Sequence, residues 1–205
     1  MAQEGIELRG VRSLRSGVLL MLLVPLLVFV AMVVAMLVAW PRFAFAVYHA
    51  GPAHFYYGFG YASAAAVLAG AATVIVLAIV ALALAVVALA RLREGFRALS
   101  AAGKGGRAGD VGVVLVVVGV LLALLGAAIF IVAPLAFLLE LVAWAVVIIG
   151  YILVGVGIFE VGEAFGNSTT KIGGILTAIP VPIVTFVGLV ISYVGLGEVE
   201  ASLRR

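Results

Sequence analysis

The sequence contains no cysteine and few charged residues. Without cysteine, disulfides and thiolate metal sites are excluded. Charged residues make up 10% of the 205 residues, whereas an ordinary soluble domain carries about 25%. So few charges cannot cover a surface that faces water. The composition therefore indicates a protein whose outer surface faces lipid.

Apolar residues are abundant and continuous. They form 67% of the chain, and a helix needs about 20 of them in a row to cross a hydrocarbon core about 30 Å thick. The tract 111–159, interrupted only by Pro134 and Glu140, is too long for one crossing and is expected to fold back as a helical hairpin. The sequence predicts an all-α, polytopic transmembrane helix bundle of about five spans, within a range of four to six, near residues 16–40, 61–90, 111–133, 141–159 and 172–193.

The segment before the first span mixes apolar and charged residues. Residues 1–15 are therefore expected to form an amphipathic segment at the cytoplasmic surface, and residues 16–205 a single transmembrane helical domain. With five alternating crossings, nine basic residues lie on the side of the N-terminus and three on the other, namely Arg42, Arg204 and Arg205. By the positive-inside rule the N-terminus is cytoplasmic and the C-terminus is outside.

Three glycines mark one face of the third span. Gly112, Gly119 and Gly126 recur every seven residues, and small residues allow helices to approach closely in lipid. This stripe predicts tight helix packing, either within one subunit or between subunits.

Two further pairs of residues are candidate sites. Pro180 and Pro182 fall inside the fifth span and are expected to kink or unwind it; broken helices line binding sites in some transporters, although ordinary membrane helices also tolerate proline. Glu160 and Glu163 share one face of a helix end. Such a pair can bind a cation or exchange protons, but an interfacial pair balanced by Lys171 or by the basic second loop, residues 91–107, is favoured.

Several function classes are disfavoured by the sequence. No charged residue lies at the middle of a predicted span, which argues against a proton-coupled pump or a voltage sensor. His49 and His54 are only two ligands, whereas a metal site needs three or four. We expect no catalytic residues, no bound cofactor and no metal, hence no enzyme. The basic second loop is explained by topology, so nucleic-acid binding is not expected.

Two stretches resemble a known family. The opening, with Gly5–Leu8 and Leu14–Gly17, and the ending, Gly188–Val199, are similar to an uncharacterised archaeal family, domain of unknown function 973. The resemblance implies a multi-pass protein of an archaeal plasma membrane. It implies no activity and no site residues.

Two roles remain for a protein embedded in the lipid bilayer. The first is a structural or accessory membrane protein, which forms a homo-oligomer or joins other membrane subunits. The second is a small channel or transporter, suggested by Pro180, Pro182 and a faint inverted repeat in which Gly150 precedes Glu160 as Gly188 precedes Glu198.

Overall fold

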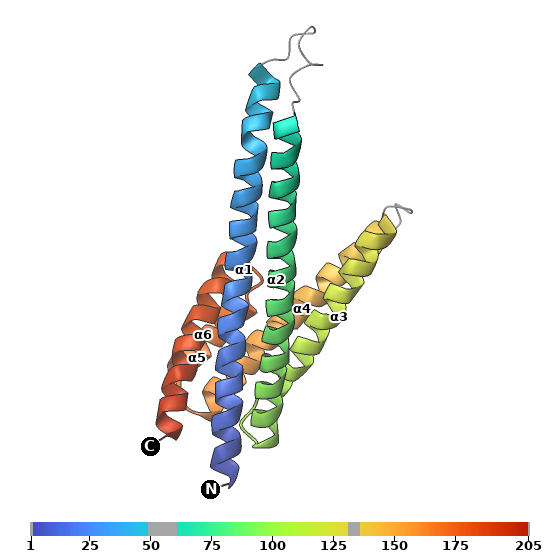
Figure 1. Ribbon diagram of the computed structural model, residues 1–205. Helices are drawn as coiled ribbons and strands as arrows, with labels where there is room; N and C mark the ends of the chain where they lie inside the picture. Colours follow the sequence, from blue (N-terminus) through green and yellow to red (C-terminus); the bar gives the residue numbers. More distant parts are fainter. Residues whose placement is uncertain (1, 49–60, 131–135, 205) are drawn as a thin grey trace. The chain divides into compact units, whose positions relative to one another are not determined.

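A computed structural model describes residues 2–48, 61–130 and 136–204 of the chain, and within these ranges it contains α-helices and no strand (Figure 1). The all-α class predicted from the sequence is therefore confirmed. The helices are α1 (Ala2–Tyr48), α2 (Tyr61–Ala101), α3 (Arg107–Phe130), α4 (Ala136–Ala164), α5 (Ser168–Ala178) and α6 (Pro182–Leu203).

Five of these helices are long and apolar enough to cross a membrane. The protein is therefore a multi-pass membrane protein, as its composition indicated. The candidate spans are Gly5–Leu37, Ala69–Ala101, Arg107–Ala127, Phe137–Ala164 and Pro182–Leu203.

The chain divides into two compact units, where the sequence led us to expect one helical domain. Unit 1 comprises residues 1–22 and 86–205, and unit 2 comprises residues 23–85. Unit 2 therefore consists of the later part of α1, the earlier part of α2 and their connection. Its large apolar side chains are mostly exposed, for example Phe29 and Ile79 at 63% and 62%. Such a surface is stable only against lipid or another apolar partner.

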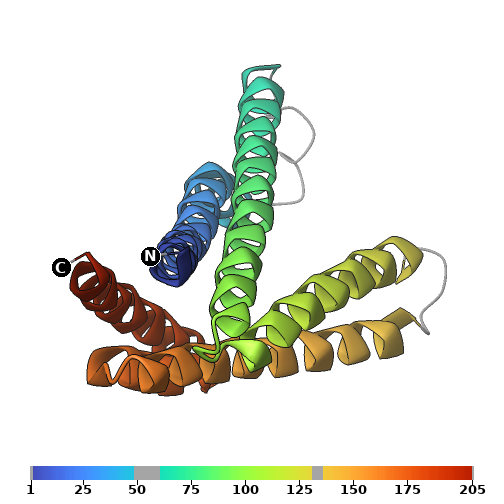
Figure 2. The same ribbon diagram turned by 90° about the horizontal axis from the view of Figure 1, so that it is seen from below.

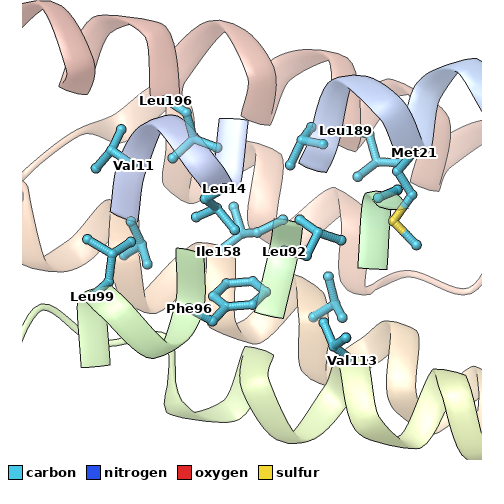
Figure 3. Packing of buried hydrophobic residues seen from close by; sticks show 14 of the residues in the cluster. Val11, Leu14, Met21, Leu92, Phe96, Leu99, Val113, Ile158, Leu189 and Leu196 are labelled. Carbon is cyan, nitrogen blue, oxygen red and sulfur yellow. The ribbon is translucent and has the colours of Figure 1, made fainter. Parts of the chain in front are cut away.

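The core of unit 1 is built from α1, α2, α3, α4 and α6 (Figure 3). The first two helices pack closely because glycines replace side chains at their contact. A Cβ on Gly17 would lie 2.8 Å from the backbone nitrogen of Leu92, and one on Gly95 would lie 2.6 Å from that of Leu14. Phe96, at the centre of the cluster, is fully buried.

The start of α1 differs from the expected surface segment over residues 1–15. The helix begins at Ala2 and continues without interruption to Tyr48. Val11 and Leu14 are fully buried in the core. The apolar face of this segment is thus covered by helices of unit 1 and not by the membrane surface.

The tract 111–159 folds back as predicted. Helices α3 and α4 lie side by side (Figures 1 and 2), and their connection falls outside the described residues. A Cβ on Gly112 would lie 2.6 Å from the backbone nitrogen of Val154, and one on Gly119 would lie 2.9 Å from that of Val147. Both glycines therefore lie against α4 of the same chain.

The predicted span 172–193 is wrong. The chain breaks after Ala178, and α5 has only 11 residues, which rise about 16 Å and cannot cross a bilayer. Helix α6 then runs back along α5, since Gly173 lies against Ser192 and Gly188 against Thr177.

The reversal at this break changes the topology. The end of α6 lies beside the first turns of α1, because Glu200 is 3.0 Å from Arg15. The two ends of unit 1 therefore share one side, and the expectation that the C-terminus lies on the side opposite the N-terminus is wrong. Helices α5 and α6 thus form a hairpin in which the start of α5 lies beside the end of α6, since Asn167 donates to Glu198 at 2.8 Å.

Candidate functional site

Charged side chains gather at one end of unit 1. The start of α1, the end of α2, the start of α3, the ends of α4 and α6, and the start of α5 meet there. Their contacts form a continuous polar layer, in which the ion pairs are Arg12–Glu200, Arg15–Glu200, Arg204–Glu200, Arg91–Glu94, Arg93–Asp110, Arg97–Asp110 and Lys104–Glu7. Such a layer belongs at the membrane boundary, where charges meet water and headgroups.

Glu200 is the centre of the densest group. Its side chain is only 6% exposed and contacts three guanidinium groups. Arg12 Nε lies 3.3 Å from Oε1, and Arg15 Nη1 lies 3.0 Å from Oε2. Arg204 donates to Oε1 from one helical turn later. A carboxylate this buried requires such partners, because an uncompensated charge would be costly.

The guanidinium of Arg15 is held on a second side by α6. Its Cζ lies 4.6 Å from the centre of the Tyr193 ring, a cation–π contact. Gly197 provides the space, since a Cβ there would lie 3.2 Å from that Cζ. Arg15 is accordingly the least exposed arginine of the group, at 34%. We call Arg12, Arg15, Arg204 and Glu200 the Glu200 cluster.

A second group of charges joins α1, α2 and α3. Ser13 of α1 donates to Glu94 at 2.9 Å. Arg93 and Arg97, also on α2, both contact Asp110 in the first turn of α3. An acid at that position also interacts favourably with the helix dipole. These contacts fix the ends of three helices, and every carboxylate among them is engaged.

Glu160 and Glu163, the acidic pair predicted from spacing, have different surroundings. Glu160 accepts a hydrogen bond of 2.8 Å from the backbone N–H of Gly106, in the turn between α2 and α3. Glu163 lies on the exposed face at the end of α4. Glu160 thus orders the turn before α3, and its partner is a backbone amide of the second loop.

Pro180 and Pro182 lie at the break between α5 and α6. Neither has an N–H, and the two amides between Ala178 and Pro182 bond locally: Ile179 N to Leu176 O at 3.2 Å, and Val181 N to Ile179 O at 2.8 Å. Thr185 Oγ1 also donates to Ile179 O at 2.7 Å. The amides of Ile179 and Val181 are therefore satisfied locally, but side chains at the break remain exposed, with Val181 at 47% and Ile183 at 78%.

The described part of the chain has an apolar groove but no cluster of metal ligands. Within the described residues, no group of three or more His, Cys, Asp or Glu side chains is placed to hold a metal; His49 and His54 lie outside them. A groove of about 290 Å³ between α4 and α5 is wholly apolar, lined by Gly155, Val156, Phe159, Gly174, Ile175 and Ala178. Gly126, the third glycine of the predicted stripe, is buried on α3.

A family model for proteins of unknown function, DUF973, matches residues 7–205. The chain belongs to this family. The match covers every element of unit 1 apart from the first residues of α1, so the Glu200 cluster lies within it. No curated protein and no solved structure matches the chain.

The sequence did not identify the Glu200 cluster. Arg12 and Glu200 lie 188 positions apart, and the predicted five crossings placed Arg204 on the side opposite Arg12 and Arg15. The available signals were local: Arg12 and Arg15 lie three apart, and Glu200 and Arg204 lie four apart, so each pair shares a helix face.

Proposed function

We propose that this DUF973 protein is a structural or accessory protein of the archaeal cell membrane, and that it acts in an assembly with further copies of itself or with other membrane subunits. The observation that supports this proposal is the exposed break between α5 and α6. We assign it no catalytic role, because the carboxylates Glu94, Asp110 and Glu200 of the polar layer are paired with arginines.

Helix lengths indicate how deep the break lies in the membrane. Glu140 and Glu160 on α4 are 20 residues apart, which corresponds to about 30 Å of helix, the thickness of a hydrocarbon core. On α6, the 16 residues from Glu198 to Pro182 rise only about 24 Å. With Glu198 at the same boundary as Glu160, the break lies within the hydrocarbon region.

The backbone at the start of α6 has N–H groups without an acceptor in the helix. The first N–H groups of a helix have no acceptor within it, and at the start of α6 these belong to Ile183 and Val184, because Pro182 has none. The N-cap residue Val181 makes no side-chain hydrogen bond to them. Non-helical backbone in the hydrocarbon region is stable only when protein covers it or water reaches it. A protein in an accessory role has neighbouring subunits, and one of these would cover the exposed backbone of the break.

The chain lacks cysteine, so a single introduced thiol can report on this surface. We would attach a benzophenone maleimide to Val181→Cys and irradiate the protein in its native membrane. The matched control is Val194→Cys on α6, which has a similar exposure, 51% against 47% for Val181. We expect cross-linked products at Val181 that are absent at Val194. Mass spectrometry then tells a second copy from another subunit.

A small channel or transporter is the second candidate, and the same break favours it. If water covers the break, the Val181→Cys thiol reacts with a charged, membrane-impermeant maleimide and no protein cross-link forms. Solute flux into proteoliposomes would then support this second role. If Val181→Cys neither cross-links more than Val194→Cys nor reacts from water, the break faces lipid and both proposals fail.

A further inference from the structure

The Glu200 cluster carries an excess of positive charge. Three guanidinium groups surround one carboxylate, each within 3.3 Å of it. One negative charge cannot neutralise three positive ones, so the four side chains have a formal net charge of +2. Among the described residues, the acids Glu7 and Glu198 have other partners, since Lys104 approaches Glu7 and Asn167 donates to Glu198.

Most of the N–H groups of the three arginines do not donate to Glu200. A guanidinium has five N–H donors in a planar fork, and each arginine of the cluster donates one bond to the carboxylate. Arg12 and Arg204 are more than half exposed, at 61% and 57%. The Nε of Arg15 is buried and has no hydrogen-bond partner among the described residues.

The cluster also lies where lipid headgroups are found. Arg15 immediately precedes the apolar run that begins at Ser16. Below the guanidinium, the Tyr193 ring provides the aromatic contact typical of the membrane boundary. Leu19, one turn after Arg15, is an exposed apolar residue at 39%. A ligand bound by the arginines would therefore have its apolar part beside the lipid-facing surface of α1.

We propose that Arg12, Arg15 and Arg204 bind the phosphate group of an anionic phospholipid. Arginine suits this ligand because its fork matches phosphate oxygens in a bidentate way. Glu200 acts as a positioning residue: it holds three like charges together before the lipid arrives. Basic pockets between membrane helices on the cytoplasmic side bind anionic headgroups in this manner.

The test uses the full chain in detergent and titrates it with phosphatidylglycerol or with phosphatidylcholine of the same acyl chains. Native mass spectrometry measures the bound lipid. The variant is Arg12→Gln with Arg204→Gln, which keeps the buried Arg15–Glu200 pair. We expect about thirtyfold weaker phosphatidylglycerol binding, because each basic residue near the headgroup contributes about fivefold. Phosphatidylcholine has the same phosphate but no net charge, so its binding should be weaker than that of phosphatidylglycerol and should fall less in the variant.

Two matched variants separate the site from general charge and from misfolding. Arg97→Gln removes an exposed arginine from the same polar layer, one that pairs with Asp110, and is expected to change the affinity less than twofold. Arg12→Lys with Arg204→Lys retains the charge but not the bidentate fork, so it is expected to bind phosphatidylglycerol more tightly than the glutamine variant and more weakly than the unchanged protein. An equal loss in Arg97→Gln, no rescue by lysine, or equal affinity for both lipids would overturn the proposal.

A competition experiment distinguishes a lipid phosphate from a soluble one. Inorganic phosphate is added at increasing concentration at constant ionic strength. If phosphatidylglycerol stays bound, the headgroup of a lipid is the ligand, as proposed. If inorganic phosphate displaces the lipid and the double glutamine variant fails to bind it, the arginines bind a soluble phosphate group, and the lipid assignment is overturned.

Discussion

The Arg15 guanidinium of α1 donates a hydrogen bond of 3.0 Å to the Glu200 carboxylate of α6, across 185 positions of sequence. This pair closes unit 1 by joining the start of its first helix to the end of its last. It also leaves Glu200 almost fully buried, so the carboxylate depends on its partners.

Replacing Glu200 with glutamine should destabilise the protein strongly. Three guanidiniums then lie together without their anion, and breaking a buried ion pair on one side costs about 3–5 kcal/mol. The measurement is the melting temperature of the solubilised full chain. Glu198→Gln is the control, since Glu198 is exposed and its partner is the Asn167 amide. Equal melting temperatures for the two variants would show that Glu200 contributes no more than a surface carboxylate.

A buried hydroxyl on α5 can be removed without loss of stability. Thr170 is fully buried, and its Oγ1 has no hydrogen-bond partner among the described residues. Thr170→Val keeps the shape and removes the unpaired oxygen, so we expect stability to be unchanged or higher by up to about 1 kcal/mol. Thr177→Val is the matched variant, because Thr177 Oγ1 donates to Gly173 O at 2.8 Å. It should lose about 0.5–1.5 kcal/mol. A lower melting temperature for Thr170→Val than for Thr177→Val would contradict this assignment.

Most helices could be predicted because lipid imposes a simple rule on apolar length. The uninterrupted runs near 16–40 and 61–90 lie within α1 and α2, and the tract 111–159 had to turn because no single crossing is so long. The glycines of the second loop also had a local signal: Gly103, Gly105 and Gly106 have positive φ, which favours glycine.

The last predicted span could not be resolved in the same way. A continuous helix over 172–193 and the pair α5–α6 contain the same apolar residues, so hydropathy does not distinguish them. The difference arises from packing of α5 on α4, where a Cβ on Gly174 would lie 2.5 Å from the nitrogen of Phe159. Pro180 and Pro182 indicated a break but not a reversal. The Glu200 cluster was missed as a consequence, because it exists only if α6 returns to the start of α1.

The glycine contacts of α3 can be tested within one chain. Gly112→Ala places a Cβ 2.6 Å from the backbone nitrogen of Val154, and backbone atoms cannot move aside as a flexible side chain can. Overpacking of this kind costs about 1–3 kcal/mol. Gly5→Ala is the control, because a Cβ there meets nothing within 4 Å. A reduced melting temperature with unchanged oligomer mass is expected for Gly112→Ala. A changed mass with unchanged melting temperature would instead place Gly112 between subunits.

The shared side of the two chain ends can be tested with single cysteines. Gly5→Cys and Ser202→Cys introduce thiols at exposed positions near the start of α1 and the end of α6. Because α5 is too short to cross a bilayer and α6 returns along it, both thiols should react with an impermeant maleimide from the same side of sealed membrane vesicles. The positive-inside rule further predicts that this is the cytoplasmic side, so right-side-out vesicles should protect both until they are opened. Reaction from opposite sides would mean that residues 168–203 cross the membrane once as a unit, and the pairing of Arg15 with Glu200 would then be impossible.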